Sequence, residues 1–468
     1  MNRYRPALAL LGALLAALLS GCSRERPLPP PGTPPDVVLI VIDTARADRL
    51  STYGYGRETS PNLDALAQEG RTFERARSTS TWTAPAHASM FTGLYPGAHQ
   101  TTQESWTLPD GIPTLAEELA ARGYATAGVT SNPMLTAERG FARGFEHYDE
   151  PWRGATFDPD IRALAHLQQL VADLPSPYFL FVNLIGPHAP YTSCGPECNR
   201  WARGGPEAPD TTRWPDYYRR IRRFSAAEFN HLGDLYDGEL RRADAILGRI
   251  LEELRERGRI DDTLIIVTSD HGENIGDHGH VDHLFSLYDT TVRIPLVIRL
   301  PELFPAGTRS SAPVQLPDLF PTILAVAGAD ADELSNQGTG LGDEVAIADR
   351  PQIFEYYQPL HALSVVYARS TPEQQRMLDP FDRKLEAIAT DRYKLIRGSD
   401  GSRELFDLIE DPAERSNLAH DQAALPVRED LEAQLDTWLA RYSKDAPANR
   451  APIEDETRPA LEATGYIE

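Results

Sequence analysis

The fold is decided by the stretch Asp36–His99, which opens with the apolar run Val37-Val38-Leu39-Ile40-Val41-Ile42 and closes that run on Asp43. A short run rich in Val and Ile predicts a strand that is buried on both faces of a parallel sheet. Functional groups of open α/β sheets lie just beyond the carboxyl ends of such strands, where Asp43 falls. Further on, Thr83-Ala84-Pro85 introduces a helix, because Pro suits a first helical turn. A hydroxyl at a helix start, facing a carboxylate at a strand end, predicts a site for an anion and its counter-cation.

Five segments of this stretch together carry a family resemblance. They are Asp43–Asp48, Tyr53-Gly54-Tyr55, Thr59–Leu63, Pro85–Ser89 and Thr92–Pro96. In this order they resemble the sulfatase family of the alkaline phosphatase superfamily, and the resemblance extends over residues 36–443. It implies an α/β fold, an alkaline-phosphatase-like sandwich with a large central, mostly parallel sheet flanked by helices. It also implies a small C-terminal antiparallel-sheet subdomain with one helix.

Length and charge limit the classes of function. The chain has 468 residues, enough for one large domain and a smaller one, and carries a formal charge of −23. That charge argues against a nucleic-acid partner and against adhesion to anionic lipid through the protein surface. A small or glycan-borne anionic ester remains an acceptable substrate, because a bound dication would dominate the local field.

The first residues predict export and anchoring. Two arginines precede the apolar run Ala7–Leu19, which is too short for a mature membrane helix and is typical of a signal peptide. The run ends in Leu19-Ser20-Gly21-Cys22, which resembles a bacterial lipobox with lipid attached to Cys22. We therefore expect a lipoprotein signal peptide over 1–22, a Pro-rich tether over 23–35, and a location on the periplasmic or outer face of an envelope membrane. An ordinary signal peptide or an uncleaved anchor is the alternative.

Two further cysteines, Cys194 and Cys198, surround a Gly-Pro turn. In an exported protein such a pair predicts a small disulfide rather than a metal site. They lie in an expected insertion, 192–224, whose arginines and aromatic residues either line a substrate entrance or form a solvated loop.

Four apolar runs predict further sheet strands, and the domain limits follow from them. The runs are Ala125–Val129, Tyr178–Leu184, Thr263–Thr268 and Arg293–Ile298. We expect a catalytic domain over 36–330, a C-terminal subdomain over 345–443 and a polar tail over 444–468.

A metal site is predicted at the strand ends. Asp270 and His271 follow the run Thr263–Thr268, as Asp43 follows its own run. Oxygen ligands combined with one imidazole suit a borderline dication. The predicted metal ligands are Asp43, Thr83, Asp270 and His271. We therefore expect one divalent metal ion (Mn, Zn, Ca or Mg), the alternative being a hydrated acidic loop.

Departures from the family pattern define the expected chemistry. Counting back from Pro85, Thr83 occupies the position of the formylglycine precursor and His87 that of the family arginine. Oxidation of Thr would give a ketone, so no formylglycine is expected and the hydroxyl of Thr83 itself must be the nucleophile. The family's catalytic lysine is replaced by His283.

Two more positions are implied by the resemblance. His188, within Gly186–Tyr191, matches a signature whose histidine lies in the active site. Asn132 stands where the family has cationic sulfate ligands, so it is a candidate neutral substrate donor, although a turn role is equally consistent. The predicted catalytic residues are Thr83, His87, His188 and His283.

Three functions are consistent with these residues. The first is a sulfatase-like, metal-dependent hydrolase of sulfate or phosphate and phosphonate esters. The second is a transferase of phosphoethanolamine or glycerophosphate type acting on envelope glycans or lipids, and the third is a non-catalytic metal-binding lipoprotein. Family membership favours sulfate esters. The chemistry favours phosphorus esters, because a sulfated threonine lacks the hemiacetal route by which formylglycine releases sulfate.

Overall fold

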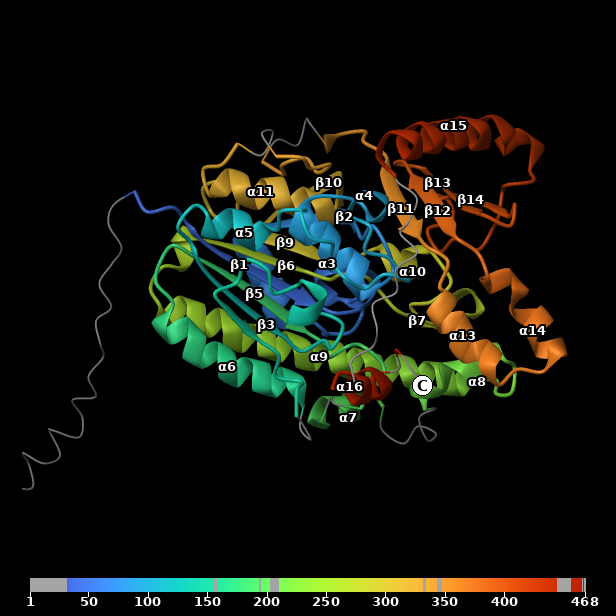
Figure 1. Ribbon diagram of the computed structural model, residues 1–468, viewed down its shortest axis with the longest axis horizontal. Coiled ribbons are helices and arrows are strands. Elements are labelled where there is room, and N and C mark those ends of the chain that lie inside the picture. Colours follow the sequence, from blue (N-terminus) through green and yellow to red (C-terminus); the bar gives the residue numbers. More distant parts are fainter. Residues whose placement is uncertain are drawn as a thin grey trace, which may run out of the picture. The chain divides into compact units, whose positions relative to one another are not determined.

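A computed structural model describes residues 32–154, 158–192, 195–202, 210–330, 334–342, 347–443, 456–464 and 466. Its centre is an eight-stranded sheet with the strand order β10-β2-β9-β6-β1-β5-β3-β4 (Figure 1). The strands are β1 Asp36–Ile42, β2 Arg71–Arg77, β3 Ala125–Thr130, β4 His147–Asp149, β5 Tyr178–Leu184, β6 Thr263–Thr268, β9 Leu296–Arg299 and β10 Thr308–Gln315. The apolar runs predicted as β1, β3, β5 and β6 are thus confirmed as strands of one sheet.

The central strands run parallel and end together. β1 pairs in parallel with β5 and β6, and β3 pairs in parallel with β5. Ile42 lies opposite Leu184, and Val41 lies opposite Thr268. β9 is antiparallel to β6 and β2, so the sheet is mixed but mostly parallel. The loops that follow β1, β3, β5 and β6 therefore leave the sheet at one edge.

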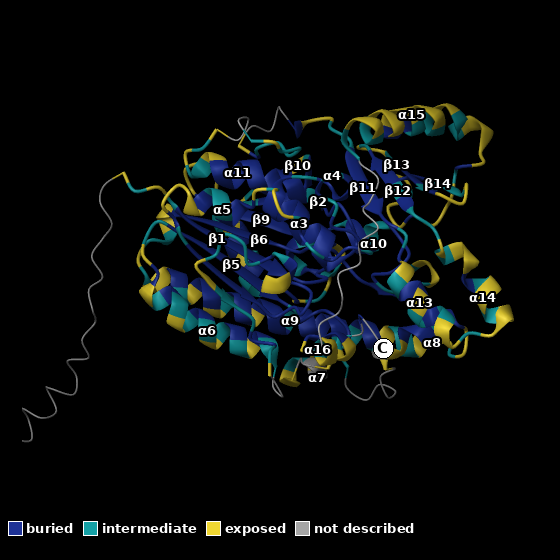
Figure 2. Ribbon diagram, in the orientation of Figure 1, coloured by how far each residue is buried: buried dark blue, intermediate teal, exposed yellow. Residues whose placement is uncertain are grey.

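Alternate side chains of β1 enter two different cores. Val37, Leu39 and Val41 pack with α3, α5 and α11, whereas Val38 and Ile40 pack with α2, α6 and α9. Figure 2 shows the strands between these helix layers as buried. The helices are α2 Pro61–Glu69, α3 Thr83–Thr92, α5 Leu115–Ala120, α6 Pro159–Asp173, α9 Ala226–Glu256 and α11 Leu319–Val326. Burial of both faces explains the uninterrupted apolar runs.

A second, antiparallel sheet follows in the C-terminal part of the chain, with the order β11-β12-β13-β14. Its strands and its long helix are β11 Gln352–Tyr356, β12 Leu385–Ala389, β13 Tyr393–Gly398, β14 Arg403–Asp407 and α15 Leu425–Tyr442. One face packs on α15 through Ile388 and Leu395, and the other packs on Leu287 and Val292 beside α10 (Asp289–Val292). The predicted fold class, a large sheet plus a small antiparallel one, is confirmed.

A buried cation joins the small sheet to the main one. Lys394 of β13 is fully buried, and its Nζ lies 2.9 Å from Asp289 Oδ1 and 2.8 Å from Glu414 Oε1. Arg77 at the end of β2 also pairs with Asp289, at 2.8 Å. This network connects β13 to the loop that carries His283 toward the site.

The expected insertion contains α7 (Cys198–Trp201) and α8 (Trp214–Tyr218). Arg219, at the end of α8, is buried, and its Nε donates to the carbonyl oxygen of Val366 in α13 (Leu360–Ala368). This arginine therefore holds two helices together. Beyond α13 the chain adds α14 (Pro372–Leu378).

Some sequence predictions fall outside the described residues. The signal peptide and Cys22 do so, as does Cys194 of the predicted disulfide with Cys198. Among the described helices, none has both the length and the apolar character that a membrane crossing needs.

Candidate active site

The loop after β1 brings two strand ends into contact. Asp43 is completely buried, and Thr44 after it adopts a positive φ of 55°. This conformation, uncommon for a residue other than glycine, lets the Thr44 amide donate to Asp270 Oδ1 at 3.1 Å. Asp270 follows β6, so the ends of β1 and β6 are held together at the site.

Helix α3 brings Thr83 to the same place. Thr83 is the first residue of the helix and is completely buried. Its Oγ1 lies 3.4 Å from Nε2 of His271. The helix ends at Thr92 and is capped by Gly93, whose φ of 69° and whose close approach to Phe320 leave no room for a side chain. A buried helix that begins at the site gives the hydroxyl a fixed position and a helix N-terminus behind it.

Three buried side chains bring possible cation ligands close together. Ligand atoms of Asp43, Asp270 and His271 all lie within 4.8 Å of one another. Asp43 Oδ1 and Asp270 Oδ2 are buried and have no hydrogen-bond partner among the described residues. His271 Nδ1 lies 3.0 Å from the carbonyl oxygen of Gly272, so Nδ1 carries the proton and Nε2 offers its lone pair. These residues fit a divalent cation, with Thr83 Oγ1 at its edge.

The pKa directions agree with a site built for a cation. Burial raises the pKa of Asp43 well above its usual value, and the neighbouring Asp270 raises it further. Burial lowers the pKa of His271 to about 3, so its imidazole is neutral at pH 7. The two close carboxylates repel each other until a positive charge lies between them, and the neutral imidazole leaves a lone pair free for such a cation.

His87 lies one helical turn after Thr83. Its Nδ1 donates to the carbonyl oxygen of Thr83 at 2.9 Å and lies 3.6 Å from Asp270 Oδ2. Its ring packs edge-on against Phe181 of β5. Burial lowers its pKa. In this arrangement His87 supports the first turn of α3 and faces the Asp270 carboxylate.

His188 and His283 face each other beside the cluster, with ring centroids 5.1 Å apart. His188 Nδ1 donates to the carbonyl oxygen of Ala189 at 2.6 Å, and burial lowers its pKa to about 4. Burial alone would lower the pKa of His283 too, but Asp282 and Glu273 outweigh it and raise that pKa well above its usual value. Nδ1 of His283 lies 2.8 Å from Asp282 and 3.6 Å from Glu273. Of this pair, His188 therefore has a lowered pKa and His283 a raised pKa.

Asn132, at the end of β3, has both amide hydrogens engaged. Its Nδ2 donates to Asp43 Oδ2 at 2.6 Å and to the hydroxyl oxygen of Tyr466 at 3.0 Å. In this structure the predicted substrate donor therefore holds the Asp43 carboxylate and the Tyr466 hydroxyl.

Tyr466 is a site residue that the sequence analysis missed. It follows the short helix α16 (Arg458–Ala463), within the residues 444–468 expected as a polar tail. It is only 4 % exposed, and its hydroxyl lies 2.8 Å from Thr83 Oγ1. The available sequence signal was weak: two large apolar residues, Leu461 and Tyr466, in a polar context.

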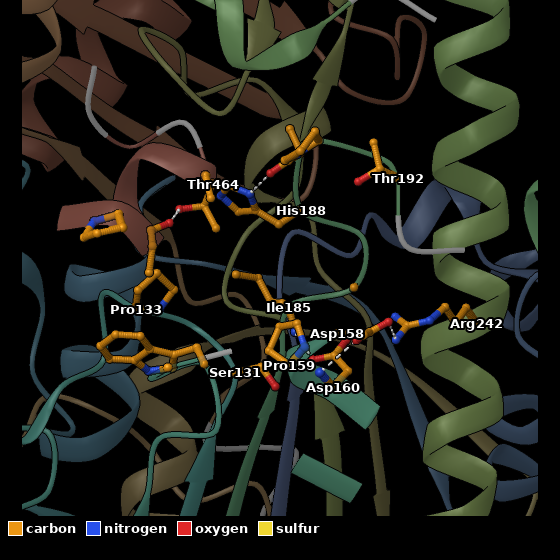
Figure 3. Close-up of a pocket in the computed structure, with 18 of the residues that line it drawn as sticks. Ser131, Pro133, Asp158, Pro159, Asp160, Ile185, His188, Thr192, Arg242 and Thr464 are labelled. Carbon is orange, nitrogen blue, oxygen red and sulfur yellow. Dashed lines mark hydrogen bonds and ion pairs between the residues drawn. The ribbon is translucent and has the colours of Figure 1, made fainter. Parts of the chain in front are cut away.

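A pocket of about 650 Å³ opens beside these residues. His188 and Ser131 line it from the sheet edge, and Ala460 and Ala463 of α16 line it together with the following Thr464. Figure 3 shows His188 and Thr464 on one side of the pocket and Arg242 on another. Asp158 and Asp160 lie beside Arg242, which pairs with both. The pocket has the volume of a site for a group the size of a sugar or a larger organic ester.

Comparisons with known proteins agree with this geometry. A family profile described as Sulfatase matches residues 35–329, and one described as N-sulphoglucosamine sulphohydrolase, C-terminal, matches residues 276–441. The chain is 28% identical to the multifunctional alkaline phosphatase superfamily protein PehA of Trinickia caryophylli, over 87% of this chain and 96% of that protein. It is 22% identical to an N-acetylglucosamine-6-O-sulfatase of Bacteroides thetaiotaomicron, over 95% and 93% of the two chains.

A solved structure has a similar fold. The phosphonate monoester hydrolase of Agrobacterium radiobacter superimposes with a TM-score of 0.68 at 23% identity, over 87% of this chain and 96% of that one. At that identity the likeness concerns the fold.

Proposed function

The chain belongs to the sulfatase family and is an ester hydrolase of that family, and we propose that within this family it cleaves phosphate or phosphonate esters in preference to sulfate esters. The nucleophile in this proposal is Thr83 Oγ1. The observation that carries it is the position of this hydroxyl, buried at the start of α3 and 3.4 Å from His271 Nε2. No aldehyde hydrate can form from threonine, so release of a sulfate group from Thr83 would need direct attack on a sluggish ester.

The chain's own residues account for the bond changes. Thr83 Oγ1 releases its proton to water and attacks phosphorus, and the bond from phosphorus to the leaving oxygen breaks in line with it. His188 and His283 face each other and both contact the ring of Tyr466, whose hydroxyl lies at Thr83; one of the two histidines passes a proton to the leaving oxygen. A water then attacks phosphorus and gives a proton to the histidine that had protonated the leaving oxygen. The Thr83 ester bond breaks, and Thr83 Oγ1 takes back a proton from water. His87 holds the first turn of α3 throughout, through the Thr83 carbonyl.

Members of this family are metal-dependent, and the acidic and histidine groups described above suit a divalent ion. Asp43, Asp270 and His271, with Thr83 at the edge, would hold one Mn, Zn, Ca or Mg ion. Such an ion, when bound, supplies Lewis-acid stabilisation of the nucleophile and of the charge that develops on the transferred group.

The substrate is proposed as an anionic ester on a glycan or a group of similar size. The pocket beside His188 supports this, because its volume of about 650 Å³ accommodates a leaving group larger than the ester itself. Lipidation at Cys22 would place the enzyme at the envelope surface, where such glycans occur. The name of the N-acetylglucosamine-6-O-sulfatase relative is consistent with this class.

A substrate panel tests the proposal. Purified protein supplied with Mn²⁺, Zn²⁺ or Ca²⁺ is assayed on an aryl sulfate, a phosphate monoester, a phosphodiester and a phosphonate ester, with Thr83→Ala alongside. We expect phosphorus-ester turnover that disappears in the variant. Sulfate turnover faster than phosphorus-ester turnover would contradict the argument about threonine sulfate.

A further inference from the structure

The C-terminal segment supplies a hydroxyl to the nucleophile. The Tyr466 hydroxyl lies 2.8 Å from Thr83 Oγ1, and distance alone leaves either oxygen as the donor. The tyrosine ring contacts those of His188 and Trp82, at centroid distances of 5.0 and 6.2 Å. The hydroxyl is therefore held at the reacting oxygen by a packed ring.

The side-chain amide of Asn132 decides the direction of this hydrogen bond. The backbone amide of Met134 donates to Asn132 Oδ1 at 2.8 Å, so the amide oxygen is identified and Nδ2 must be the other atom. Nδ2 has two hydrogens, and its two acceptors are Asp43 Oδ2 at 2.6 Å and the Tyr466 hydroxyl oxygen at 3.0 Å. Tyr466 thus accepts from Asn132, and its own proton is directed at Thr83 Oγ1.

The other side of Thr83 is consistent with this direction. His271 Nδ1 donates to the carbonyl oxygen of Gly272, which leaves a lone pair on Nε2 facing Thr83 Oγ1. The Thr83 hydroxyl therefore accepts a hydrogen bond from Tyr466, and its own hydrogen points away from the tyrosine. The chain of donors runs from Asn132 through Tyr466 to Thr83.

From this arrangement we propose that Tyr466 is a catalytic residue, donating a hydrogen bond to Thr83 Oγ1 that strengthens as this oxygen loses its proton. The inference rests on the proposed role of Thr83 as the nucleophile. A donor to a charged oxygen contributes more than one to a neutral hydroxyl, so its effect falls on the step in which the charge develops.

The same segment closes one side of the pocket. Leu461 of α16 is completely buried in the core that also contains Trp82 and Ala84 at the start of α3. Ala460, Ala463 and Thr464 line the pocket next to His188. Docking of α16 therefore places the Tyr466 hydroxyl and shapes the leaving-group pocket together.

The test compares Tyr466→Phe with the full-length protein on the best phosphorus-ester substrate. Phenylalanine keeps the ring contacts and removes only the donor. We expect kcat to fall about 10- to 100-fold with little change in KM, because the lost hydrogen bond is to a charged group of the transition state. Tyr442→Phe, at a half-buried tyrosine at the end of α15, is the matched control and should leave both parameters unchanged.

Two further measurements separate the alternatives. Hydrogen exchange of α16 should be the same in Tyr466→Phe and the wild type, which shows that the segment stays docked. A chain that stops after residue 455 should lose at least as much activity as Tyr466→Phe. Faster turnover in both variants would show that the segment is an inhibitory plug and would overturn the inference.

The inference and the proposed function also fail differently. Turnover that requires Thr83 but is unchanged in Tyr466→Phe would overturn the role of Tyr466 alone. Turnover that survives in Thr83→Ala would overturn both.

Discussion

Replacing Lys394 with Met should reduce the free energy of unfolding by about 3–5 kcal/mol, the cost of breaking a buried ion pair from one side. Lys394 Nζ is fully buried between Asp289, at 2.9 Å, and Glu414, at 2.8 Å. Methionine has nearly the same length and fills the same space without the charge. The loss in the free energy of unfolding therefore measures what the buried ion pairs of Lys394 contribute to the contact between the two sheets.

The cost falls unequally on the two carboxylates. Asp289 keeps Arg77, at 2.8 Å, when Lys394 is removed. Glu414 loses its cation, and burial already raises its pKa to about 7. In the variant Glu414 must become protonated or remain as an uncompensated buried charge. The double variant Lys394→Met with Glu414→Gln should therefore recover part of the lost stability, since the stranded charge is removed as well.

Lys384→Met is the matched control. Lys384 also pairs with a carboxylate at 2.8 Å, that of Glu386, but 28% of its side chain is exposed. Its replacement should cost about 0–1 kcal/mol, as for other exposed pairs. Urea unfolding of the three variants and the wild type measures the differences. Equal losses in Lys394→Met and Lys384→Met would refute the reasoning from burial.

Two further predictions concern acid stability and metal retention. Burial lowers the pKa of His99 to about 3 from an ordinary value of 6.5, so the unfolded chain takes up a proton as pH falls below 6.5 while the folded chain does not. His99 therefore lowers the free energy of unfolding by up to about 1.4 kcal/mol for each pH unit below 6.5. In urea unfolding between pH 7 and pH 5, the free energy of unfolding of His99→Gln should therefore fall less than that of the wild type. Asp43→Asn and Asp270→Asn should each lower the amount of bound divalent metal that elemental analysis measures after dialysis. Asp48→Asn, outside the cluster, is the control and should retain the metal. Equal retention in all three variants would contradict the ligand set.

Much of the fold could be predicted from local pattern. β1, β3, β5 and β6 are buried on both faces, so their sequences are continuous apolar runs that need no partner to be recognised. β2, with the sequence Arg-Thr-Phe-Glu-Arg-Ala-Arg, was not predicted, because its arginines and glutamate are satisfied by groups elsewhere in the fold. Arg77, for example, pairs with Asp289 more than 200 positions later in the chain.

The site residues likewise fall into those that the local sequence pattern predicted and those that it did not. Asp43, Asp270 and His271 stand at the carboxyl ends of recognisable strands, and parallel pairing brings such ends together. Tyr466 could not be placed, because its contact with Thr83 spans 383 positions and depends on how α16 docks. The role of Asn132 was also hidden, since its hydrogens go to Asp43 and to that same tyrosine. Tertiary docking of a short polar segment leaves little trace in its own sequence.

The most direct test of the central claim is mass spectrometry of protein quenched in acid during turnover of a phosphorus ester. A nucleophilic Thr83 predicts one added phosphoryl or phosphonyl group on the peptide containing residues 81–89. That mass should disappear in Thr83→Ala and persist in Thr83→Ser. Turnover with no adduct on this peptide in any quenched sample, or an adduct on another residue that survives in Thr83→Ala, would contradict the account.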